Sequence, residues 1–97
     1  MDQAGVKRVE RRVVFSGRVQ GVGFRFRTDE IAHRYRVGGF VQNQPDGTVL
    51  LVVEGEPHEV DPMIDEVKSA MAPYIRAVSE SPGQSTTDFE QFGIRHH

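Results

Sequence analysis

Two segments of this 97-residue chain carry apolar side chains at helical spacing, and β-rich segments lie on either side of each. Residues three, four and seven positions apart share one face of a helix. Each segment therefore has an apolar stripe that must pack against another surface. A chain of this length has room for one core, which both helices must share. The first stripe is Phe24, Thr28, Ile31, Ala32 and Tyr35. The second stripe is Val60, Met63, Ile64, Val67 and Met71.

Glycine and proline predict where these helices are bounded. Gly38 and Gly39 stop the first helix, and Pro73 stops the second. Pro62 fits only in the first turn of the second helix, because a proline farther in removes a hydrogen bond and clashes with the preceding turn.

The remaining β-rich runs predict strands. A tight turn over 44–47 contains Pro45 and Gly47, so the two runs that flank it should pair as a hairpin. The order along the chain is β-α-β-β-α-β with a short extra C-terminal strand. This order predicts an α+β fold, the ferredoxin-like sandwich, with two helices on one face of a mostly antiparallel sheet. The expected strands are 9–19, 40–43, 48–54, 75–78 and a last one containing Phe92 and Ile94.

Domain organisation follows from the same pattern. We expect a flexible N-terminal tail over 1–8 and a single domain over 9–97. The stretch 81–88, rich in serine, threonine, glycine and proline, is typical of a surface loop.

Several function classes are excluded by composition. The chain has no cysteine, which removes disulfides, thiolate metal ligands and a cysteine nucleophile. No histidine pair has metal-ligand spacing backed by a carboxylate on the same face, so no metal site is expected. No apolar run approaches the ~18 residues of a membrane span, and the first dozen residues lack the apolar stretch of a signal peptide. We therefore expect a cytoplasmic protein, a monomer by default, without a membrane partner.

Charge is distributed unevenly along the chain, whose net charge is −2. Residues 1–36 hold nine of the twelve basic side chains, and residues 37–97 are acidic. This pattern indicates either an ordinary solvated surface or an anion site in the first third. The acidic balance disfavours a nucleic-acid partner. An RNA reader of this fold would need exposed aromatic residues on its central strands, and the run 48–54 has none.

The stretch from Gly17 to Arg25 is the strongest candidate for an anion site. It joins a strand to a helix and contains three glycines and no proline, so every residue keeps its N–H group. Such a loop can turn its N–H groups inward beside the positive end of a helix, and Arg25 can add a forked pair of donors. The simpler interpretation is a flexible turn followed by a surface arginine. The stretch lacks the third glycine of a Rossmann fingerprint and the Gly-Lys-Ser/Thr of a Walker A loop.

Asn43 is a second candidate, at the end of a strand and just before the 44–47 turn. It either helps to shape the turn, as asparagine commonly does, or presents a neutral amide that aims a water molecule. The sequence gives no distance between Asn43 and the glycine-rich stretch.

Two motifs resemble the signatures of the acylphosphatases. The first is Gly17-Arg18-Val19-Gln20-Gly21-Val22-Gly23-Phe24-Arg25. The second is Gly39-Phe40-Val41-Gln42-Asn43, followed by Gly47, Val49 and Gly55. The separation of Arg25 from Asn43 also matches, and the resemblance covers roughly residues 9–95.

The resemblance implies an activity and a site. Acylphosphatases hydrolyse the carboxyl–phosphate bond of small-molecule acyl phosphates without metal or cofactor, and they have the ferredoxin-like fold. Arg25 would complete the phosphate site and Asn43 would hold the attacking water. The loop residues that would bind phosphate through backbone amides are Arg18, Val19, Gln20, Gly21, Val22, Gly23 and Phe24. The alternative is a module that binds phosphate or an acyl phosphate without turnover.

Two positions depart from the family pattern. Phe15 stands where the family usually has leucine, isoleucine or valine. The family commonly ends its first helix with Leu-Gly, where this chain has Tyr35-Arg36. A non-glycine residue forced into the left-handed region there would cost about 1 kcal/mol.

Overall fold

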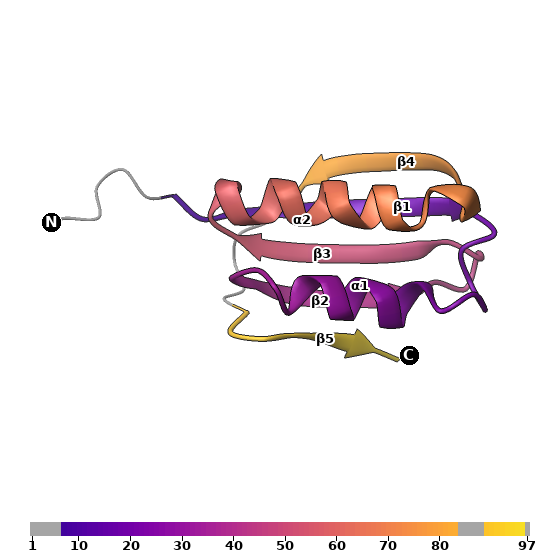
Figure 1. The fold of residues 1–97 in the computed structure, drawn as a ribbon, viewed down its shortest axis with the longest axis horizontal. Coiled ribbons are helices and arrows are strands. Elements are labelled where there is room, and N and C mark those ends of the chain that lie inside the picture. The colour runs from indigo at the N-terminus through magenta and orange to yellow at the C-terminus, as the bar shows by residue number, and fades with distance from the viewer. Residues whose placement is uncertain (1–6, 84–88, 97) are drawn as a thin grey trace, which may run out of the picture.

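The computed structural model describes residues 7–83 and 89–96, which form a five-stranded sheet with two helices on one face (Figure 1). The strand order is β4-β1-β3-β2-β5. β5 runs parallel to β2, and the other neighbouring strands are antiparallel. The predicted ferredoxin-like sandwich with an extra C-terminal strand is confirmed. The elements are β1 (Val9–Gly17), α1 (Phe24–Ala32), β2 (Val37–Asn43), β3 (Val49–Gly55), α2 (Pro57–Ala70), a short 3₁₀ turn η1 (Ala72–Tyr74), β4 (Ile75–Pro82) and β5 (Phe92–Arg95).

The main core lies between the helices and the sheet. Alternate side chains of β1 and β3 point toward the helices, which place their apolar stripes on them. α2 packs on β3 and β1, whereas α1 packs on β2 and β5. Burying each large apolar side chain of this core stabilises the fold by roughly 1.5–3 kcal/mol. The largest buried members are Phe15, Phe24, Ile31, Leu51, Met63 and Ile64.

The other face of the sheet carries a smaller apolar cluster around Phe40, Leu50 and Val52. The guanidinium carbon of Arg95 lies 3.7 Å from the centre of the Phe40 ring, and the ring of Phe89 meets that ring edge-on at 6.0 Å. Phe40 is therefore covered and offers no open surface on which a base could stack.

The first helix ends earlier than its apolar stripe predicted. α1 ends at Ala32, and the N–H groups of Arg34 and Tyr35 donate to carbonyls three residues back, in tight turns. Tyr35 still packs against the main core, so the stripe marked a buried face and not the helix boundary. The departure from Leu-Gly at Tyr35-Arg36 costs no left-handed strain, because no described non-glycine residue has a positive φ.

Gly38 and Gly39 do not stop a helix as predicted, since both lie inside β2. Gly39 has φ of +131°, and a Cβ atom there would overlap the carbonyl oxygen of Val52 on β3. Position 39 must therefore be glycine because β2 and β3 approach closely there. The local sequence pattern does not reveal this approach.

Pro62 lies in the second turn of α2, not in the first turn as predicted. The helix begins at Pro57, which takes the first helical position where its missing N–H is harmless. Pro62 is exposed, so the helical hydrogen bond that it cannot donate is lost on the solvent side.

Two strands end at residues other than those predicted. β1 stops at Gly17 and not at Val19, after a register shift against β4 between Ser16 and Gly17. β4 continues to Pro82, which pairs with Arg11, so the start of the expected 81–88 loop is strand. A proline is tolerated there because β4 is an edge strand. Residues 84–88 of that loop and 1–6 of the expected tail lie outside the described residues.

Candidate active site

The loop of residues 18–24 connects β1 to α1 at one end of the sheet (Figure 1). Gly21 and Gly23 both have φ of +80°, in the left-handed region that glycine enters without strain. Val19 is fully buried in the main core, and the N–H of Arg18 donates to the carbonyl of Tyr74 at 2.9 Å. The loop is thus anchored at its start and turns sharply twice before the helix.

Beyond Arg18, the N–H groups of this loop differ from those of the sheet and helices in lacking backbone partners within the described part of the chain. Among the described residues, no backbone carbonyl accepts from the N–H groups of residues 19–23. Gly23 is the N-cap of α1 and supplies no side-chain cap, so the first turn of the helix adds further open donors. Backbone N–H groups that lack backbone acceptors beside the positive end of a helix can bind an anion.

Gln20 joins this loop to the β2–β3 hairpin. Its Nε2 atom donates to the carbonyl oxygens of Gln44 at 2.8 Å and Thr48 at 2.9 Å. These two bonds connect segments more than twenty residues apart and give the proximity that the sequence could not. The sequence placed Gln20 in the loop but carried no signal for this bracing role.

Asn43 is the last residue of β2, immediately before Gln44, and is half-buried. The turn beside it is held by other groups. The Asp46 carboxylate accepts from the N–H of Thr48 at 3.1 Å and from its hydroxyl at 2.6 Å. These two bonds lower the pKa of Asp46. Asp46 and Thr48 therefore hold this turn together beside Asn43.

Arg25 lies in the first turn of α1 and reaches toward the end of β5. Its Nη1 atom donates to Nδ1 of His96 at 3.4 Å. Gln42 on β2 pairs with Arg95 on β5, so the residues that follow them, Asn43 and His96, leave the sheet at the same end. The fold therefore brings Arg25, Asn43 and the 18–24 loop to one end of the sheet. The sequence did not single out His96.

The sequence model of the acylphosphatase family matches residues 11–94. The chain belongs to the acylphosphatase family. The acylphosphatase of Lacticaseibacillus paracasei is 33% identical over 89 residues, covering 90% of this chain and 96% of the relative. The acylphosphatase of Nocardioides sp. is 39% identical over 85 residues, covering 86% of this chain and 84% of the relative.

A solved structure agrees with these relatives. The crystal structure of acylphosphatase from Bacillus subtilis aligns with a TM-score of 0.80 at 27% identity, covering 90% of this chain and 98% of that chain. The resemblance read from the two sequence motifs is thereby confirmed, and so is the predicted class of enzyme, an acylphosphatase.

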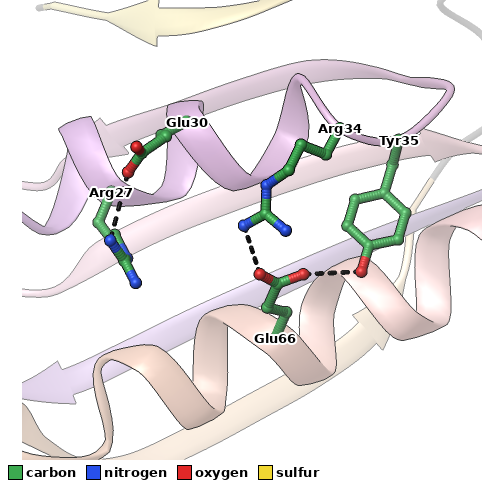
Figure 2. Close-up of polar contacts among 5 residues, drawn as sticks. All are labelled: Arg27, Glu30, Arg34, Tyr35 and Glu66. Atoms are coloured by element: carbon green, nitrogen blue, oxygen red, sulfur yellow. Dashed lines mark hydrogen bonds and ion pairs between the residues drawn. The ribbon is translucent and has the colours of Figure 1, made fainter.

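Beyond the opposite end of α1, two side chains of the following turn bond to α2 (Figure 2). The Glu66 carboxylate on α2 accepts from the Arg34 guanidinium and, at 2.7 Å, from the Tyr35 hydroxyl. Those two bonds lower the pKa of Glu66, and the bond to Glu66 raises the pKa of Tyr35. These three polar side chains of the acylphosphatase fold are thus bonded to one another.

Two further observations concern the described part of the chain. Its histidine, aspartate and glutamate side chains form no group of three or more that could hold a metal ion. None of its helices has the length and apolar character needed to cross a membrane.

Proposed function

We propose that this chain hydrolyses the carboxyl–phosphate bond of small acyl phosphates, giving a carboxylate and inorganic phosphate. Family membership supports this activity. The main support for the proposed site is that the N–H groups of residues 19–23 have no backbone acceptor among the described residues. These groups lie at the same end of the sheet as Arg25 and Asn43.

In the proposed mechanism, the 18–24 loop and Arg25 hold the phosphoryl group. The N–H groups of the loop donate to its oxygens, and the glycine turns at Gly21 and Gly23 set their directions. Arg25 adds two parallel donors in a fork that matches two phosphate oxygens. The His96 ring beside Arg25 positions the guanidinium on the β5 side of α1.

Asn43 orients the attacking water behind phosphorus. The transition state of phosphoryl transfer is loose, so water needs placement more than activation. The leaving carboxylate is stable as an anion near neutral pH and needs no general acid. Positioning by a few fixed donors therefore suffices, and Gln20 holds the loop that carries the phosphate against the hairpin that carries Asn43.

The test is hydrolysis of benzoyl phosphate and acetyl phosphate at neutral pH with excess EDTA. Arg25→Ala and Asn43→Ala should each lower kcat by at least 10²–10³-fold, the usual loss when one preorganised hydrogen-bonding group is removed. Arg36→Ala removes an exposed arginine at the opposite end of α1. Gln42→Ala changes the neighbouring side chain on the other face of β2. Both controls should keep wild-type rates.

Two results would contradict the proposal in different ways. Wild-type kcat in folded Asn43→Ala would remove the water-orienting role. Phosphate binding by the folded wild-type protein without turnover of either substrate would favour the alternative of a non-catalytic binding module.

A further inference from the structure

A groove of about 510 Å³ lies between the start of α1 and the end of α2, next to the 18–24 loop. Val22 and Gly23 of that loop form one part of its lining, so the groove borders the loop of the proposed phosphate site. The aromatic side chains of Phe26 on α1 and Tyr74 on η1 form another part. In Figure 1 both helix ends that border the groove lie at the same end of the molecule as the loop.

The two aromatic side chains are unusually accessible for this protein. Phe26 is 72% exposed and Tyr74 38%, and Val78 is the other exposed large apolar side chain of the described residues. Phe26 is two positions after the buried Phe24 and lies off the core-facing stripe, so the fold does not require an aromatic residue there. Paired aromatic residues beside a binding loop offer a surface for an apolar ligand.

The position of the groove fits the direction in which the leaving group departs. In an in-line displacement the leaving group and the attacking water lie on opposite sides of phosphorus. Asn43 ends β2, and Arg25 reaches toward β5. The groove lies on the α2 side of α1, away from β5. A substrate whose phosphate sits in the loop can therefore extend its acyl part along the groove.

The charge of the groove indicates the kind of acyl group. Arg27 and Glu30 both line it, and the Arg27 Nη1 atom lies 3.3 Å from Glu30 Oε1 (Figure 2). Because the two charges pair with each other, the wall presents no net charge to a ligand. Resting on the function proposed above, we propose that this groove binds an uncharged, apolar or aromatic acyl group, with Phe26 and Tyr74 as the specificity-determining contacts.

The test compares kcat/KM for benzoyl phosphate and acetyl phosphate in the wild-type protein, Phe26→Ala and Tyr74→Ala. An aromatic contact contributes about 0.5–1.5 kcal/mol, so kcat/KM for benzoyl phosphate should fall about 2- to 10-fold in each variant. The value for acetyl phosphate, whose methyl group offers little apolar surface to the aromatic side chains, should stay within twofold. Val78→Ala is the matched control, because it removes an exposed apolar side chain from β4, outside the groove.

The outcomes separate the two proposals. If acetyl phosphate is hydrolysed normally but the benzoyl-to-acetyl ratio is unchanged in both folded variants, the groove does not bind the acyl group. A variant that changes sedimentation but not this ratio would assign the aromatic patch to a second copy of the chain and overturn the inference. Failure of the wild-type protein to hydrolyse either substrate would overturn the proposed function, and this inference with it.

Discussion

The two ends of α1 differ in how their polar groups are satisfied. At its start, the N–H groups of residues 19–23 have no backbone acceptor among the described residues, and the Gln20 side chain bonds the loop to the β2–β3 hairpin. Beyond its end, Arg34 and Tyr35 both donate to Glu66 and connect α1 to α2. One end keeps donors available for a ligand, while the other uses its donors within the protein.

This difference indicates which substitutions should affect activity and which should affect stability. Open donors contribute to ligand binding but not to the folded state, whereas a satisfied cluster contributes to the folded state alone. Substitutions at the loop should therefore lower activity more than stability, and substitutions at the Glu66 cluster should do the reverse. Three pairs of variants test this division.

Gly23→Ala should have the largest effect on the loop end. Alanine in the left-handed region costs about 1–2 kcal/mol, and relief of that strain displaces the N–H groups. A misplacement of about 1 Å at a reacting site costs roughly 10²-fold in rate, so we expect a loss of kcat/KM of that size. The measurements are acyl phosphate hydrolysis and urea unfolding.

Gly93→Ala is the matched control for Gly23→Ala. Gly93 lies in β5, its φ is not positive, and a Cβ atom there would have no atom within 4 Å. It should keep activity and stability. A Gly23→Ala protein with full activity would show that the glycine turn does not set the direction of the loop amides.

Gln20→Ala should have an intermediate effect, because it removes both bonds between the loop and the hairpin. Two neutral hydrogen bonds contribute about 1 kcal/mol each, so kcat/KM should fall about 30-fold. Gln44→Ala is the control, since the bond uses the backbone carbonyl of Gln44 and survives the change. A loss confined to KM, or an equal loss in Gln44→Ala, would argue against alignment of loop and hairpin by Gln20.

Glu66→Gln should change activity least, within twofold at pH 7, but should change how stability depends on pH. The bonds from Arg34 and Tyr35 keep the pKa of Glu66 below its usual value. The stabilisation is therefore fully present above the unfolded pKa of about 4.3 and is lost as pH falls through the lower folded pKa. Urea midpoints of wild-type protein should fall between pH 7 and pH 3 more steeply than those of Glu66→Gln.

Asp65→Asn makes the same change in charge at an exposed position of α2 and serves as the control for Glu66→Gln. It should retain the wild-type pH dependence. If Glu66→Gln and wild type lose stability in parallel on acidification, the Glu66 cluster does not connect the helices as the structure indicates.

The sequence by itself determined the order of elements and the location of the loop. Two helical stripes, alternating strands and a proline-containing turn predicted the sandwich correctly, because these periods reflect one buried face per element. The glycine-rich stretch 17–25 and its separation from Asn43 pointed to the family, which the comparisons confirmed. The roles of Arg25 and Asn43 stay predictions until their variants are measured.

Only the tertiary structure decided where helices end and which distant groups meet. The stripe ending in Tyr35 overran α1 because packing against the core, and not the helix, buries that ring. The glycine at position 39 is required by the carbonyl of Val52 on a neighbouring strand. The bracing role of Gln20 and the contact of His96 with Arg25 depend on partners 24 to 71 residues away. Such pairings are set by strand register and layer packing, which local periodicity does not specify.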